Sequence, residues 1–127
     1  MKSFYPQKEP FNFLGLVNQN PKKAKFWILP VPYETTVFNL SGTKDGPEAI
    51  ISASRCIELF DEELQKEFPK NLIFTLSPIS LSKNSPKEAI EQIKKATKEI
   101  LKRKKIPVLL GGEHTISLGA ILALKEF

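Results

Sequence analysis

The stretch Val108-Leu-Leu-Gly-Gly-Glu-His114-Thr-Ile-Ser117 decides the fold class that we predict for this chain of 127 residues. An apolar run leads into two glycines, a carboxylate and the only histidine of the sequence. If the run is a strand of a parallel sheet, the side chains after the glycines stand at its carboxyl end, where open α/β sheets bind ligands. Neutral imidazole is a common metal ligand. His114 is therefore the first candidate for chemistry.

Outward from this stretch, the sequence pattern alternates between strand and helix. Residues 26–31 are almost continuously apolar, as expected for a strand that is covered on both faces. Further strands are predicted at residues 72–76 and 107–110, and helices from Gly46 to Cys56 or beyond, from Ser85 to Lys105 and from Ser117 to Phe127. Alternation of this kind predicts an α/β fold with a doubly wound parallel sheet between two helical layers.

The helix predicted to begin after Ser85 has the clearest signals. Ser85 can cap it, Pro86 suits its first position, and Glu88 stands where a capping box needs an acidic residue. The residues predicted to share its inner face are Ile90, Ile93, Thr97, Ile100 and Leu101. The basic residues 102–105 then suit the final turn of a helix.

Three stretches show no clear period. Residues 1–25 are predicted to form an irregular arm with an apolar anchor at Phe11, Phe13, Leu14 and Leu16. Residues 32–46 form a long connection, and long loops are often functional. Residues 57–68 are acidic and apolar by turns, and the sequence leaves open whether they form a second helical piece or a loop.

Composition narrows the classes of function. The net charge of +5 comes almost entirely from lysines that are spread along the chain without interleaved stacking aromatics. This pattern predicts a solvated surface rather than one that binds nucleic acid or membrane. A lone Cys56 excludes an internal disulfide and is expected to be a small buried hydrophobe. Neither a secretory pattern nor a run of roughly 18 apolar residues is visible, so a cytoplasmic location is expected.

The passages Pro30-Val-Pro-Tyr-Glu-Thr-Thr36, Gly42-Thr-Lys-Asp-Gly-Pro-Glu-Ala-Ile50 and Leu110-Gly-Gly-Glu-His-Thr-Ile-Ser117 carry a family resemblance. In their order and spacing they resemble the amino-terminal part of the ureohydrolase (arginase/agmatinase) family, and most closely its agmatinase branch. The last passage is similar to the first metal-binding motif of that family, Gly-Gly-Asp/Glu-His-Ser, with Thr115 in the place of serine. The resemblance implies an arginase-like three-layer α/β/α fold with a mainly parallel sheet, of which residues 1–127 would be the amino-terminal part.

The resemblance also implies a site for two Mn²⁺ ions. In the family, the ligands are the histidine of this motif and the residues of Asp-x-His-x-Asp and Asp-x-Asp motifs further along. His114 matches the first ligand, and it alone can be carried over, because no Asp follows Asp61 and the chain has no second histidine. No catalytic residue is assigned in this chain. Gly111, Gly112, Glu113 and Thr115 are expected to support the ligand or the loop, since a ligating imidazole often donates its other N–H to a carboxylate or carbonyl.

By this resemblance, the complete enzyme would be a cytoplasmic homo-oligomer that hydrolyses a small guanidino compound. Two manganese ions can activate water for this reaction by lowering its pKa. The closeness of the three passages to the agmatinase branch makes agmatine, which would give putrescine and urea, the expected substrate ahead of arginine, guanidinobutyrate and formiminoglutamate. The chain alone is expected to be inactive, as a truncated product or one half of a split gene. The alternative is a non-catalytic binding or assembly module, or a degenerate remnant of the fold.

Overall fold

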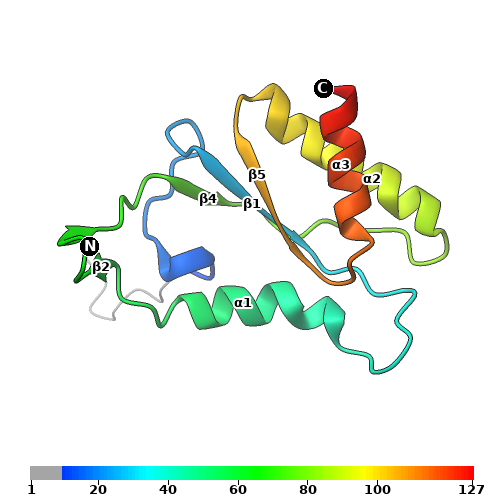
Figure 1. The fold of residues 1–127 in the computed structure, drawn as a ribbon, viewed down its shortest axis with the longest axis horizontal. Helices are drawn as coiled ribbons and strands as arrows, with labels where there is room; N and C mark the ends of the chain where they lie inside the picture. Colours follow the sequence, from blue (N-terminus) through cyan, green and yellow to red (C-terminus); the bar gives the residue numbers. More distant parts are fainter. Residues whose placement is uncertain (1–9) are drawn as a thin grey trace, which may run out of the picture.

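A parallel sheet of three strands forms the centre of the computed structural model, which describes residues 10–127. The middle strand, β1 (Phe26–Val31), lies between β4 (Ile73–Thr75) and β5 (Ile106–Gly111) (Figure 1). In this register Ile28 lies opposite Thr75 on one side and Val108 on the other. The three predicted strands and their parallel pairing are confirmed.

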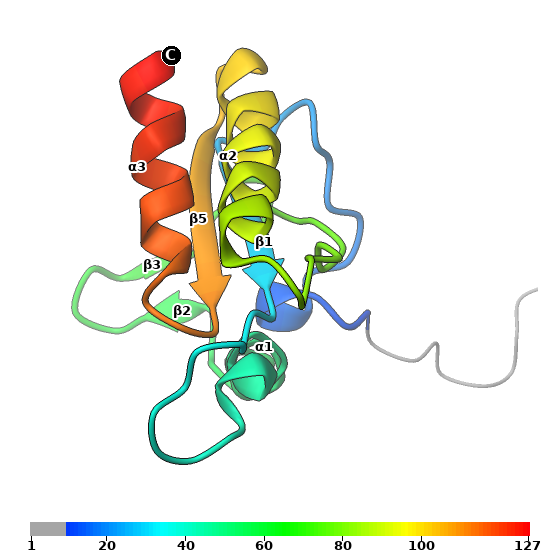
Figure 2. The same ribbon diagram turned by 90° about the vertical axis from the view of Figure 1, so that its right-hand side faces the viewer.

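Helices cover the sheet in two layers. The helices α2 (Pro86–Lys102) and α3 (Ile116–Glu126) pack against each other over one face, whereas α1 (Gly46–Ser54) lies on the other side with the short 3₁₀ helix η1 (Phe13–Gly15) (Figures 1 and 2). A second 3₁₀ turn, η2 (Thr43–Asp45), leads into α1. The predicted α/β/α arrangement is therefore confirmed.

The core lies on both faces of β1, because successive side chains of a strand point to opposite faces. Trp27, Leu29 and Val31 are buried against α2 and α3. Ile28 is buried on the other face with Leu16 and Ile73. Coverage of both faces explains why this strand has a continuous apolar sequence.

Helix α2 begins as its sequence predicts. The Ser85 hydroxyl accepts a hydrogen bond from the Glu88 N–H at 3.2 Å, and Pro86 occupies the first turn. The inner face buries Ala89, Ile93, Thr97 and Ile100, while Ile90 and Leu101 are half-buried. The helix ends at Lys102 rather than Lys105, because the chain then turns through Lys104, which has a φ of 56°.

Residues 57–68 form neither a helix nor an irregular loop. They contain a short antiparallel hairpin, β2 (Phe60–Asp61) and β3 (Lys66–Glu67), in which the Asp61 carboxylate accepts a hydrogen bond from the Leu64 N–H. All four strand residues are exposed. Two residues are too few to show the alternation of apolar and polar residues that reveals a strand in a sequence.

Two further expectations are wrong in part. Cys56 is exposed, because α1 ends at Ser54 and the cysteine lies in the turn beyond the packed face of the helix. In the apolar anchor Leu16 is buried and Phe13 and Leu14 pack beside it, but Phe11 is largely exposed and stacks under Arg55. The rest of the predicted arm, residues 1–9, lies outside the described residues. Within residues 10–127, no helix is long and apolar enough to span a membrane.

Candidate metal-ligand site at the carboxyl end of the sheet

Three separate segments meet where β1 and β5 end. The Tyr33 carbonyl, just after β1, accepts a hydrogen bond from the Glu113 N–H at 3.0 Å. A Cβ on Gly112 would lie 2.3 Å from the same carbonyl oxygen, and a Cβ on Gly46 would lie 2.8 Å from the Gly111 oxygen. Side chains at these two positions would force the segments apart, so the glycines permit the junction.

Glu113 fixes the loop that follows β1. Its buried carboxylate accepts hydrogen bonds from the N–H of Thr35, from the N–H of Thr36 at 2.6 Å and from the Thr36 hydroxyl at 2.6 Å. Burial opposes the charged form, but the three hydrogen bonds outweigh it and hold the pKa of this carboxyl below its ordinary value. A charged carboxylate is therefore tied to the start of residues 35–45, the 35–45 loop, which includes the 3₁₀ turn η2.

Glu34 fixes the far end of the same loop. One of its carboxylate oxygens accepts hydrogen bonds from the Gly42 N–H at 2.5 Å, the Thr43 hydroxyl at 2.9 Å and the Lys44 N–H at 3.3 Å. The bond from Gly42 is the main reason that the pKa of Glu34 lies below its ordinary value. Two carboxylates thus hold a loop whose tip, at Phe38 and Leu40, is exposed.

His114 lies in the turn between β5 and α3, and its side chain is exposed. Its carbonyl accepts a hydrogen bond from the Ser117 N–H at 3.0 Å, which fixes the backbone. The imidazole forms no hydrogen bond with any side chain of residues 10–127, Glu113 included. Thr115 caps α3 without a side-chain hydrogen bond. The structure therefore presents a free imidazole at the carboxyl end of the sheet.

The described residues contain no cluster of potential ligands that could hold a metal ion on its own. Nowhere in residues 10–127 do three or more His, Cys, Asp or Glu side chains gather in a group that could hold a metal ion. Catalytic metal sites generally need three protein ligands or more. His114 is suited to ligation by its chemistry and exposure, but it does not make a manganese site within this part of the chain.

The sequence did not reveal the two carboxylate ties. Glu113 and the two threonines are 77 and 78 positions apart, so no local pattern links them. The length of the connection predicted at residues 32–46 was the signal that the sequence offered. It identified a loop of interest without naming its partner.

The fold and this junction define a class of protein: a three-layer α/β protein with its candidate site at the carboxyl ends of parallel strands. A family comparison is more specific. The model of the arginase family matches residues 24–127, and the chain belongs to that family. The predicted resemblance is thereby confirmed.

Curated relatives match this chain over part of their length. The N(1)-aminopropylagmatine ureohydrolase of Thermococcus kodakarensis is 32% identical over 107 residues, covering 83% of this chain and 37% of the relative. The Synechocystis protein of the same name is 32% identical over 104 residues, covering 78% and 34%. The agmatinase of Bacillus subtilis is 28% identical over 103 residues, covering 81% and 36%. This chain spans little more than a third of these proteins.

Solved structures confirm the fold. A hypothetical agmatinase from Burkholderia thailandensis superimposes with a TM-score of 0.78 at 20% identity, covering 94% of this chain and 39% of the other. The agmatine ureohydrolase of Thermoplasma volcanium gives 0.76 at 22% identity, covering 92% and 39%. The formimidoylglutamase of Bacillus subtilis gives 0.77 at 19% identity, covering 98% and 41%. The described fold is therefore part of a larger arginase-like fold.

Proposed function

We propose that this chain is the amino-terminal part of a ureohydrolase that hydrolyses a guanidino compound, and that His114 provides one ligand of its metal centre. The carrying observation is the convergence of the three family-like passages on the turn that presents His114. The imidazole of His114 is exposed and the backbone that carries it is fixed, which suits a metal ligand that acts together with ligands from outside residues 10–127. Two manganese ions at such a centre would supply activation of water.

The residues around His114 have a positioning role in this proposal. Glu113 holds the first residues of the 35–45 loop, and Gly112 allows the backbone after β1 to approach. Together they fix the turn before α3 relative to the sheet, so that the backbone that carries the imidazole keeps one position. Within this chain no residue is proposed to transfer a proton or to attack the substrate.

Agmatine is the proposed substrate. N(1)-aminopropylagmatine is the second compound to test, because the two relatives at 32% identity are named as its ureohydrolases. Both compounds combine a guanidino group with an aliphatic amine. Cytoplasmic location and homo-oligomeric assembly of the whole protein stay predictions.

A chimera tests this function. The chain is joined to the carboxyl-terminal part of the Thermococcus kodakarensis relative, and urea release is measured with manganese and either amine substrate. We expect manganese-dependent release that His114→Ala abolishes, together with weaker manganese binding in calorimetry, while Ser117→Ala at a nearby exposed position keeps both. Equal activity and equal manganese binding in the His114→Ala chimera would contradict the proposal.

A non-catalytic module is the second candidate, because residues 10–127 hold no cluster of three or more potential metal ligands, and a binding or assembly protein needs none. Manganese titration of the chain alone addresses it. Submicromolar binding of about two ions per chain would exclude the module, since so tight a site needs several ligands. Two results together would favour the module: a folded chain that does not bind manganese tightly, and a chimera that releases no urea.

A further inference from the structure

The amino end of the sheet, opposite the turn that carries His114, contains a hollow lined by basic side chains. Figure 1 shows that the turn before β1 and the turn between α2 and β5 both lie at this end. The hollow has a volume of about 520 Å³, which is within the usual range for small-molecule sites. Its lining, which we call the basic hollow, consists of Pro21, Lys22, Trp27, Arg103 and Lys105. Within the described part of the chain, no acidic side chain belongs to this lining.

Only part of this positive charge serves the end of α2. Arg103 donates to the carbonyl and to the carboxylate of Glu99 in the last turn, as expected of a basic residue at the carboxyl end of a helix. Lys105 instead donates to the Lys22 carbonyl at 2.7 Å, across 83 positions of sequence. The Lys22 ammonium has no hydrogen-bond or ion-pair partner within residues 10–127. The end of the helix therefore does not account for the two lysines of the basic hollow.

Backbone hydrogen bonds fix the segments that carry these lysines. The Asn20 side-chain oxygen accepts a hydrogen bond from the Lys22 N–H at 2.9 Å, and its carbonyl accepts one from the Ala24 N–H at 2.9 Å. The Ile106 N–H donates to the Lys25 carbonyl at 2.9 Å and joins this turn to the start of β5. Cations that are gathered around one hollow without a carboxylate among them create a local positive potential, which attracts an anion.

Trp27 adds a donor without a partner to the basic hollow. The residue is only 9% exposed, and its indole N–H has no hydrogen-bond partner within residues 10–127. Buried donors are nearly always hydrogen-bonded in native proteins, because an unpaired donor loses its hydration without compensation. An indole N–H can donate but not accept, so it requires an acceptor such as an anionic oxygen.

A second hollow adjoins the first one beside β4. Trp27 and Arg103 line it too, and Glu99 contributes the carboxylate on this side. That carboxylate is already bonded by Lys102 at 2.8 Å and by Arg103 at 3.3 Å. Its negative charge is thus compensated within the last turn of α2, and it leaves the charges of Lys22 and Lys105 unbalanced.

We propose that the basic hollow binds a small molecule through a phosphate group. A phosphate monoester carries nearly two negative charges at neutral pH and several acceptor oxygens. These match the cations of Lys22, Arg103 and Lys105, residue types that commonly bind phosphate, and the donor of Trp27. A single carboxylate would compensate less of the positive charge. Because the hollow and His114 lie at opposite ends of the sheet, the inference does not depend on the proposed function.

Fluorescence tests the site directly, because Trp27 is the sole tryptophan of the chain. The purified chain is titrated with inorganic pyrophosphate, while potassium chloride keeps the ionic strength constant. We expect a change in emission that saturates, together with one binding site per chain in calorimetry. Citrate is titrated in the same way as a polycarboxylate of comparable charge. It should bind about tenfold more weakly, because its carboxylates do not present the oxygens of a phosphate group.

Two substitutions separate the site from a general attraction of anions to a basic chain. Lys22→Gln removes a charge of the lining but keeps the backbone carbonyl that accepts the bond from Lys105. It should weaken pyrophosphate binding by about tenfold. Lys23→Gln is the matched control, because it changes the net charge equally at the next position, which is exposed and does not line the hollow. Binding should then change by less than about twofold, since solvent and salt screen an exposed charge.

Circular dichroism of both variants checks that the fold is kept. An emission that stays constant, or that changes without saturating, would overturn the inference. Equal weakening by Lys22→Gln and Lys23→Gln would do the same, because only the net charge would then matter. Calorimetric binding without a change in Trp27 emission would place the anion elsewhere. Citrate binding as tight as that of pyrophosphate would overturn the assignment to phosphate.

Discussion

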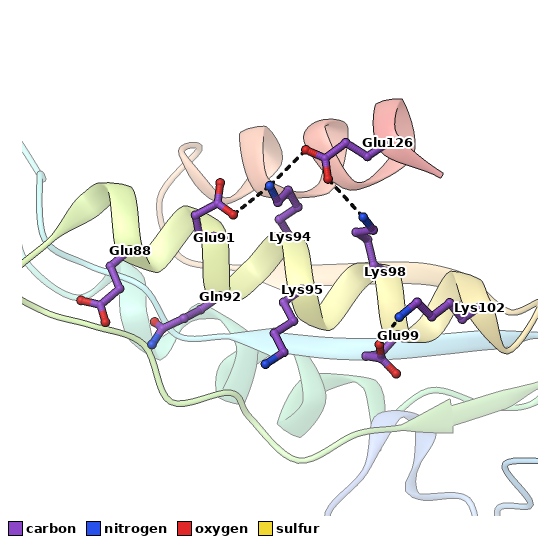
Figure 3. Close-up of a pocket in the computed structure, with 9 residues that line it drawn as sticks. All are labelled: Glu88, Glu91, Gln92, Lys94, Lys95, Lys98, Glu99, Lys102 and Glu126. Atoms are coloured by element: carbon purple, nitrogen blue, oxygen red, sulfur yellow. Dashed lines mark hydrogen bonds and ion pairs between the residues drawn. The ribbon is translucent and has the colours of Figure 1, made fainter.

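Helices α2 and α3 lie side by side on the same face of the sheet, yet their outer faces are opposite in character (Figures 2 and 3). The outer face of α2 carries lysines and glutamates, and Lys94 and Lys98 both reach Glu126 at the end of α3. The outer face of α3 carries Leu118, Ile121 and Leu124 instead. A charged face is adapted to water, whereas an exposed apolar stripe is typical of a surface that contacts protein.

Two neighbouring helices can therefore differ in how much of their apolar surface they bury. Helix α2 has one buried apolar face and one solvated charged face, so its apolar surface is covered. Helix α3 buries Ile116, Gly119 and Ala123 but leaves Leu118, Ile121 and Leu124 largely exposed. Four substitutions test this contrast.

The largest effect is expected from Ile93→Ala, on the inner face of α2. Ile93 is fully buried and contacts α3 at Gly119. Removing its side chain should lower the free energy of unfolding by about 2–5 kcal/mol, as measured in urea denaturation. Lys95→Ala, on the exposed side of the same helix, is the control and should change it by no more than about 0.5 kcal/mol.

Gly119→Ala should come next. Its Cβ would lie 2.7 Å from the Ile93 Cγ2 atom and 3.0 Å from the Ile90 carbonyl oxygen, so α2 and α3 would have to separate. Overpacking of this kind costs about 1–3 kcal/mol, and the better helix propensity of alanine offsets part of it. In the double variant with Ile93→Ala the overlap with Cγ2 is lost, but the close approaches to the Cβ of residue 93 at 2.8 Å and to the Ile90 carbonyl oxygen at 3.0 Å remain, so the two costs should add only in part. Full additivity in the denaturation cycle would show that the Cγ2 atom of Ile93 contributes nothing to the overlap.

A smaller and pH-dependent effect is expected from Glu126→Gln, which removes the ion pairs between the helices. Hydrogen bonds from Lys94 and then Lys98 lower the pKa of Glu126 from its ordinary value of 4.5. A lowered pKa in the folded state means that the contribution to stability is present above pH 4.5 and is lost as the pH falls through the lowered value. The thermal unfolding midpoints of the two proteins should therefore differ slightly near neutral pH and converge in acid. A difference that persists in acid, or that resists high salt, would point to packing instead of charge.

The smallest effect on stability is expected from Ile121→Glu in the isolated chain. Because the side chain is 60% exposed, the free energy of unfolding should change by roughly 0.5 kcal/mol or less. Binding of a hydrophobic dye should decrease at the same time. A loss as large as that of Ile93→Ala would mean that this face of α3 is packed, and the contrast between the two helices would disappear.

Local signals predicted the elements well. The continuous apolar run of β1, the cap at Ser85 and the glycines after β5 each act within a few residues of chain, so their effects are visible in the sequence. The hairpin at residues 60–67 was missed because its strands have two residues each and no buried face. Cys56 was misplaced because one turn decided its exposure.

Long-range contacts were beyond the reach of these signals. The family motif identified His114 and its neighbours, but the sequence could not show that the Glu113 carboxylate is bound to Thr35 and Thr36. The sequence also predicted residues 107–110 as an ordinary strand of the sheet, without indicating that one edge of β5 would be open within residues 10–127.

By itself, the sequence determined the alternation of strands and helices, the limits of the strong elements and the family to which the chain belongs. The elements follow from hydrophobic period, capping and turn chemistry, which act between residues close together in the chain. The family follows from the resemblance of three passages to its motifs. The tertiary structure alone decided the order of the strands, the hydrogen bonds between Glu113 and the 35–45 loop and the exposure of the outer face of α3. Each of these depends on groups that meet only after the chain has folded, and the apolar character of a residue does not specify which partner will cover it.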